Sequence, residues 1–147
     1  MILDNLLEFA DATAIPTSTG TAIVGDVIDL GLANRNVGQS SHLYLVIQVD
    51  TAATSGGSAT VAFHLVSDAQ AALATDGTAT YHWSSPALAV ASITAGRQIV
   101  AIGLPSGTYE RYLGVLATVA TAALTAGKIN AFITSDVSAW QAYPDAL

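Results

Sequence analysis

The sequence of 147 residues contains no cysteine, which excludes disulfide bonds, thiolate zinc sites and a thiol nucleophile. Charge is also scarce, because only 10% of the residues are charged, whereas about 25% is usual in a soluble domain. Four basic residues stand against eleven acidic ones, and the formal net charge is -7. An acidic protein releases no counterions from nucleic-acid phosphates, so we expect no nucleic-acid partner. A surface so poor in charge is typical both of a dry contact with another protein and of a compact domain with a neutral exterior.

The sequence also shows neither a secretory signal nor a membrane-spanning segment. The first eight residues have no basic region and place Asp4 and Glu8 among apolar residues, unlike a signal peptide. The uncharged stretch between Arg111 and Lys128 is shorter than the roughly 20 residues of a membrane helix, and threonine and glycine interrupt it. We therefore expect no membrane partner and a soluble protein, either intracellular or part of an assembled particle.

The sequence does contain many short β-branched and aliphatic runs, separated by glycine, proline, asparagine, aspartate and serine. This pattern is typical of a β-rich fold. It predicts strands at 24–32, 43–49, 59–66, 87–93, 98–104, 111–120 and 128–134. Alternation with a period of two predicts a core made of Leu45, Ile47, Val61, Phe63, Leu65, Leu113 and Val115. His64 falls on the other face of its strand, where we expect contact with solvent or with a partner.

Two segments have some helical character. The stretch 116–126 is rich in alanine, the best helix former, but its β-branched Thr118, Val119 and Thr121 favour a strand. A capping-box pattern at 67–70 predicts at most one helical turn directly after it.

Strands of this number and spacing, with no long helical crossover, predict a single-domain antiparallel β-sandwich or barrel of about eight strands over residues 1–147. In this scheme residues 1–15 form an N-terminal arm or short helix, and residues 137–147 form a short C-terminal tail. The large apolar and aromatic side chains of the two ends are candidate interface residues, namely Leu6, Phe9, Trp140 and Tyr143.

The sequence offers no constellation of catalytic or metal-binding residues, so we expect no enzyme, no cofactor and no metal site. The histidines His42, His64 and His82 are far apart and lack metal-ligand spacing. Asp26 and Asp29 are close paired acids, but a spacing of three places them on opposite faces of a strand, which disfavours joint acid–base work.

Tyr81, His82 and Trp83 form the one aromatic cluster along the chain. Such a cluster usually covers a sheet edge or packs in an interface, and less often it stacks on a sugar. We therefore add these three residues to the interface candidates.

Four segments together resemble a known family: 27–31, 43–50, 109–114 and 142–144. Their order and spacing are similar to the jelly-roll capsid cement, or decoration, proteins of short-tailed phages, the family typified by the Bordetella-phage cement protein. The resemblance implies a jelly roll that forms a homodimer or homotrimer. It also implies a virion protein, made in the host cytoplasm, that binds the outer surface of a tailed-phage capsid and stabilises contacts between subunits of the major capsid protein. The alternative is a carbohydrate- or receptor-binding β-sandwich module of a phage tail.

Overall fold

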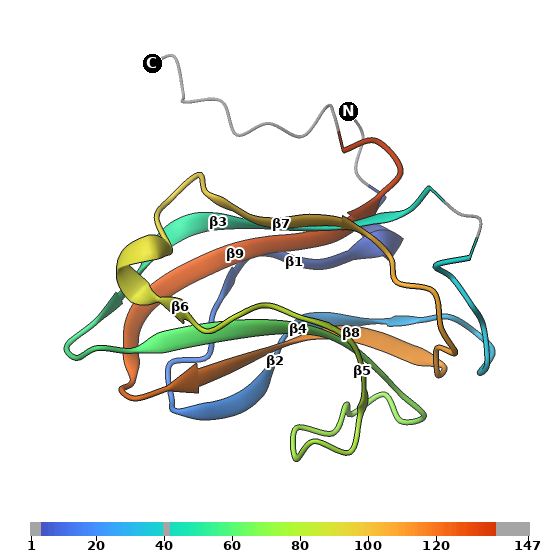
Figure 1. The fold of residues 1–147 in the computed structure, drawn as a ribbon, viewed down its shortest axis with the longest axis horizontal. Coiled ribbons are helices and arrows are strands. Elements are labelled where there is room, and N and C mark those ends of the chain that lie inside the picture. The colour runs from blue at the N-terminus through green and yellow to red at the C-terminus, as the bar shows by residue number, and fades with distance from the viewer. Residues whose placement is uncertain (1–3, 40–41, 138–147) are drawn as a thin grey trace.

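Two antiparallel sheets packed face to face form the structure, a computed structural model that describes residues 4–39 and 42–137 (Figure 1). Within these ranges there are nine strands. The four-stranded sheet consists, in spatial order, of β1 (Glu8–Ala14), β9 (Leu124–Thr134), β3 (Tyr44–Ser55) and β7 (Gln98–Gly103). The five-stranded sheet consists of β2 (Gly20–Asp29), β8 (Tyr112–Ala120), β4 (Thr60–Asp68) and β5 (Thr80–Ser84), with the short β6 (Leu88–Ala89) also paired to β4.

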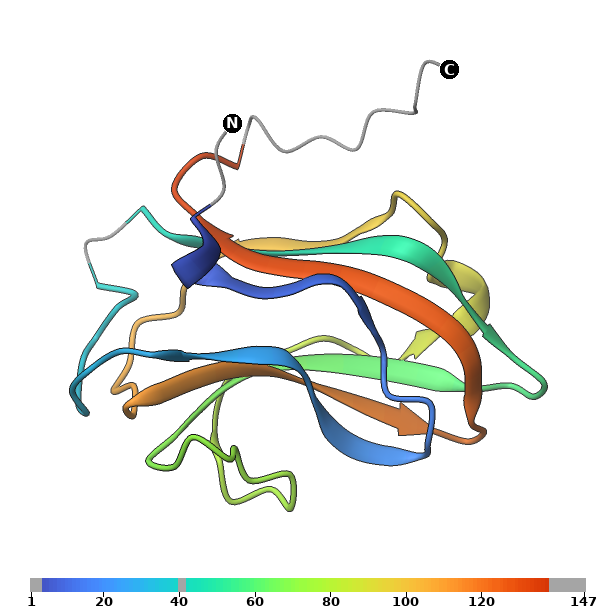
Figure 2. The ribbon, with the colours of Figure 1, turned by 180° about the vertical axis from the view of Figure 1, so that it is seen from behind.

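The strand pairs are nested within one another along the chain. The hairpin β4–β5 lies innermost, and β3–β7, β2–β8 and β1–β9 enclose it in turn, all of them antiparallel. Apart from the two-residue β6, this is the eight-stranded order of a jelly roll (Figure 2). The predicted jelly-roll sandwich of about eight strands is therefore confirmed.

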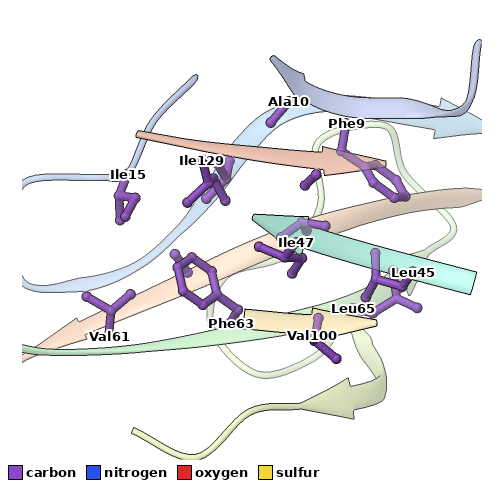
Figure 3. Close-up of a cluster of buried hydrophobic side chains, with 14 of the residues drawn as sticks. Phe9, Ala10, Ile15, Leu45, Ile47, Val61, Phe63, Leu65, Val100 and Ile129 are labelled. Atoms are coloured by element: carbon purple, nitrogen blue, oxygen red, sulfur yellow. The ribbon is translucent and has the colours of Figure 1, made fainter. Parts of the chain in front are cut away.

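The core lies between the two sheets and follows the alternation read from the sequence (Figure 3). All seven predicted core residues are fully buried: Leu45, Ile47, Val61, Phe63, Leu65, Leu113 and Val115. The stretch from residue 116 is strand as far as Ala120. There Thr121 adopts a positive φ of 73° in the turn, and β9 begins at Leu124, four residues earlier than predicted.

The N-terminal arm predicted for residues 1–15 is wrong for its second half. Residues 8–14 form β1, which pairs with β9, and Phe9 is 0% exposed. The reason is that Phe9, Ala10 and Ile15 all reach the core, so this segment gains more from burial than from lying free on the surface. Phe9 is therefore a core residue rather than an interface residue.

Three other expectations also needed correction. The predicted strand at 87–93 is only the two residues of β6, followed by the short 3-10 helix η2 (Val90–Ser92). The segment 80–84, for which no strand was predicted, is the strand β5. The helical turn expected at 71–73 is a loop. The short η1 (Asn5–Leu7) precedes β1, and no helix in the described part of the chain is long and apolar enough to cross a membrane.

The edges of the two sheets meet at Gly25 in β2. Its φ is +71°, a conformation that favours glycine, and an added Cβ would lie 1.9 Å from the carbonyl oxygen of Phe9 in β1. A side chain at this position would force β1 and β2 apart.

We expect Gly25→Ala to lower the free energy of unfolding by at least about 3 kcal/mol, because backbone strain and the clash with β1 add together. Chemical denaturation measures this loss. Gly56→Ala is the control, since a Cβ there meets nothing within 4 Å, and it should change stability by about 0.5 kcal/mol or less. Equal stability of the two variants would show that the approach of β1 to β2 is not tight.

Candidate interaction surface

The outer face of the five-stranded sheet carries polar but uncharged side chains. In β4, Val61, Phe63 and Leu65 point into the core, so the alternating Ala62 and His64 point outward. The prediction that His64 faces away from the core is confirmed.

A row of hydrogen-bonded side chains crosses this face from β2 to β5. The hydroxyl oxygens of Thr21 and Thr118 are 2.8 Å apart. Thr118 Oγ1 also lies 3.0 Å from Nε2 of His64, and Ser84 Oγ lies 2.8 Å from its Nδ1. Both ring nitrogens of His64 thus have hydroxyl partners. We call these four residues the polar row.

Part of this outer face is covered. The loop 69–79 folds back over this part, where Leu73 packs with Val66 and Leu116 in a second apolar cluster. Around the polar row the face stays uncovered and also presents Thr60, Ala62, Tyr81 and Ala120. We call these four residues and the polar row the open face. Among the described residues that make it up there is no lysine, arginine, aspartate or glutamate.

A groove of about 570 Å³ adjoins the open face at Thr60. It lies between residues 53–60, at the turn that joins β3 to β4, and residues 89–91. Its lining is small and uncharged, chiefly alanine, serine, threonine and glycine. The groove therefore offers a neutral hollow into which an apolar side chain of a partner can fit.

The aromatic cluster does not form one platform. Tyr81 is 40% exposed and points outward, with its ring edge against His64 at a centroid distance of 5.2 Å. His82 turns to the other side of β5 and stacks on Tyr109, with ring centroids 3.7 Å apart. Trp83 is half-buried against the main core. One exposed aromatic ring is a poor base for sugar stacking, so the geometry disfavours the carbohydrate-binding alternative.

His82 instead belongs to a network that fixes the chain between β7 and β8. Its Nε2 lies 2.8 Å from Ser67 Oγ, which accepts the backbone N–H of Glu110 at 3.0 Å. Tyr109 is fully buried and donates its hydroxyl to the carbonyl of Pro105 at 2.6 Å, and burial raises the pKa of its phenol to about 12. The aromatic cluster therefore supports the fold at this point.

An ion pair closes the same end of the five-stranded sheet. Arg111 binds both carboxylate oxygens of Asp29, at 2.9 and 2.8 Å, and its guanidinium lies 5.1 Å from the ring centre of Tyr112. The hydrogen bonds from Arg111 and from the N–H of Gly31 lower the pKa of Asp29 to about 2. Asp29 therefore serves to join β2 to β8.

The sequence predicts that Asp26 and Asp29 lie on opposite faces of a strand, but the structure places them beside each other. The register of β2 shifts between Val24 and Ile28, and both acids border one shallow groove beside the exposed Leu6. The prediction fails because side chains alternate between the two faces only in a strand without a bulge.

The remaining interface candidates fall in three places. Leu6 is 78% exposed on η1, in keeping with a surface role, whereas Phe9 is buried. Trp140 and Tyr143 lie outside the described residues, as does the tail beyond Val137. Within the described residues, the interface candidates suggested by sequence are thus not brought together as one site.

Of the polar row, the sequence pattern predicts only the outward position of His64. Thr21 and Thr118 are 97 positions apart, and only the pairing of β2 with β8 makes them neighbours. The available signal was the outward alternation in β4, where Thr60, Ala62 and His64 share a face. No comparable signal marks Thr21 in the sequence of β2.

Comparison with known proteins adds the decisive observation. The family model described as Bbp16 matches residues 9–133, a span that begins in β1 and ends in β9 and so covers the whole sandwich. The chain belongs to the Bbp16 family. Bbp16 is a family of Bordetella-phage type, which agrees with the resemblance to phage proteins drawn from the sequence. No curated protein matches the chain.

Burial lowers the pKa of both His64 and His82 below the ordinary value of 6.5. In the unfolded chain both imidazoles titrate near 6.5, so just below that pH the unfolded state binds more protons than the folded state. The free energy of unfolding should therefore be fully retained above pH 6.5 and fall as the pH decreases through the lower folded-state pKa values.

Denaturant unfolding between about pH 7.5 and pH 5 tests this expectation. The double variant His64→Gln, His82→Gln should show a flatter dependence over this range than the wild type, since its glutamines do not titrate. A wild-type slope that the double variant leaves unchanged would assign the pH dependence to other groups.

Proposed function

We propose that this Bbp16-family protein is a structural virion protein that binds the outside of a tailed-phage capsid and stabilises contacts between subunits of the major capsid protein. The observation that carries the proposal is the open face. It is free of ionic side chains, and its polar row is already hydrogen-bonded within itself.

Such a face can be buried against another protein at low cost. Burying an unpaired ion costs several kcal/mol, and a buried polar group without a partner costs about 1–3 kcal/mol. The hydroxyls of Thr21, Thr118 and Ser84 and the ring of His64 have one another as partners, so a dry contact leaves them satisfied. The lowered pKa of His64 keeps this residue neutral near pH 7.

Capsid binding does not require a high affinity at each site, so it is compatible with the low affinity expected of a single uncharged contact. A shell repeats the same site many times, and an oligomer can engage two or more sites at once. Linked contacts of this kind raise the overall affinity by roughly 10²–10⁴. A protein that binds only the mature shell stabilises that shell by mass action. In this proposal the role is structural, without catalysis, cofactor or nucleic acid, and the protein lies on the outer capsid surface.

The open face can be tested by adding one charge to it. Ala62 is half-buried between Thr60 and His64, and Ala62→Glu requires a carboxylate to be desolvated on docking. We expect binding to purified shells to weaken at least tenfold, or about 1.4 kcal/mol. Ala126→Glu, at an exposed position of β9 in the other sheet, is the matched control and should bind normally. Equal binding by both variants would remove the open face from the docking surface.

The role itself can be tested with particles assembled without this protein. They should form, but lose DNA or rupture at a lower temperature or under milder osmotic shock than complete particles. Purified protein added back should restore resistance, and the Ala62→Glu variant should restore it poorly. Particles that are equally robust but fail to adsorb to cells would replace the capsid role with receptor binding.

A further inference from the structure

The outer face of the four-stranded sheet carries two apolar side chains that are buried outside the core. In β3, Leu45 and Ile47 point into the core, so Val46 between them points outward. Phe132 of β9 lies directly opposite Val46 and points the same way. Val46 is nevertheless 0% exposed and Phe132 only 1%. Neither residue belongs to the two apolar clusters that the buried residues of the described chain form.

Burial on this outer face is confined to one end of the sheet. Thr134, at the C-terminal end of β9, is buried on the same face as Phe132. Farther along the face, Lys128 of β9 and Thr51 of β3 lie opposite each other and are both exposed. The neighbouring η1 does not cover the buried end, since Leu6 is exposed and Leu7 packs with the main core. The segment that covers it therefore lies where β9 leaves the sheet.

The chain that follows β9 turns toward this outer face. The Oγ1 of Thr134 accepts the backbone N–H of Asp136 at 3.2 Å, which begins a turn on the side of the sheet away from the core. Figure 1 and Figure 2 show residues 135–137 on that side. Ten residues, 138–147, follow Val137, the last residue that the structure describes. An extended chain covers about 3.3 Å per residue, so a few of these ten suffice to reach Phe132.

We propose that the covered end of this face is the docking site of the chain's own C-terminal segment, residues 138–147, with Trp140 packed on Val46 and Phe132. Trp140 is the largest apolar side chain of the segment, and an aromatic ring gains most when it lies on another apolar surface. The inference goes beyond the proposed function and does not rest on it. The open face lies on the other sheet and stays free to bind a shell.

Gln48 of β3 adds a polar reason for a docked segment. It lies between the inward Ile47 and Val49, so it shares the outer face with Val46. Its Nε2 is buried and has no hydrogen-bond partner in the described chain. A buried donor without an acceptor destabilises the fold. A segment that lies along the face brings backbone carbonyl groups, and one of them can accept this hydrogen bond.

The test uses the fact that the sequence contains no cysteine, so that Val46→Cys introduces a single thiol. Cysteine is a small apolar residue and should be accommodated at this site. In the full chain the thiol should react slowly with a soluble disulfide reagent. In a chain that ends at Val137 it should react at least about tenfold faster, because full burial of a large apolar side chain contributes more than a factor of ten. Thr51→Cys, at the exposed end of the same face, is the matched control and should react equally fast in both chains.

Trp140→Ala in the full chain is the second variant, because it removes the contact without shortening the protein. Combined with Val46→Cys, it should raise the reaction rate as the truncation does, while the far-UV circular dichroism stays that of a β-sandwich. Fluorescence gives a separate readout, since Trp83→Phe leaves Trp140 as the one tryptophan. Its emission in the native protein should be shifted to the blue of that in the unfolded chain.

Three outcomes would overturn the inference. The first is a thiol at position 46 that reacts equally fast in the full chain and in the Trp140→Ala variant. The second is protection that falls on dilution, which would assign the covering segment to a second copy. The third is protection that depends on residues 1–3 and not on Trp140, which would assign it to the N-terminus. Failure of the protein to bind shells would overturn the proposed function alone.

Discussion

The pairing of the first strand with the last is the constraint on which the rest of this sandwich depends. β1 and β9 lie side by side, with Glu8 opposite Phe132, although more than a hundred residues separate them. β1 brings Phe9 and Ile15 into the core and closes one side of the sandwich against Gly25 of β2. Contacts of such long sequence separation carry a large loop-closure cost, so the fold depends on burial distributed over every nested pair.

The strands that could be predicted from the sequence are those in which apolar residues alternate regularly with residues of the outer face. β4 alternates from Val61 to Leu65, and its core face was read correctly. β1 was missed because it is bulged: Phe9 and Ala10 are both buried in succession, and Ala12 has a positive φ of 44°. A period-two rule cannot find a strand whose own period is broken.

The candidate surface could also be predicted only in part, because the sequence does not reveal which strands pair. Alternation identified the outward side of β4 but could not place Thr21 beside Thr118, because register between distant strands depends on the whole sheet. The aromatic run Tyr81, His82 and Trp83 was misleading for a related reason. Adjacent residues of a strand point to opposite faces of the sheet. Tyr81 and His82 are neighbours in sequence, but their rings therefore lie on different sides of β5. The scarcity of charged residues was the most useful sequence observation, because the open face contains no charged side chain.

The antiparallel contact of β1 with β9 also determines how the protein responds to mechanical load. The N-terminal end of β1 and the C-terminal end of β9 leave the same end of the four-stranded sheet (Figure 2). A force that pulls these two chain ends apart acts on one inter-strand hydrogen bond at a time and peels β1 away like a zipper. A force directed along the strands must instead shear many hydrogen bonds together. The contact of β1 with β9 is therefore weak when these two chain ends are pulled apart and strong when the load runs along the strands.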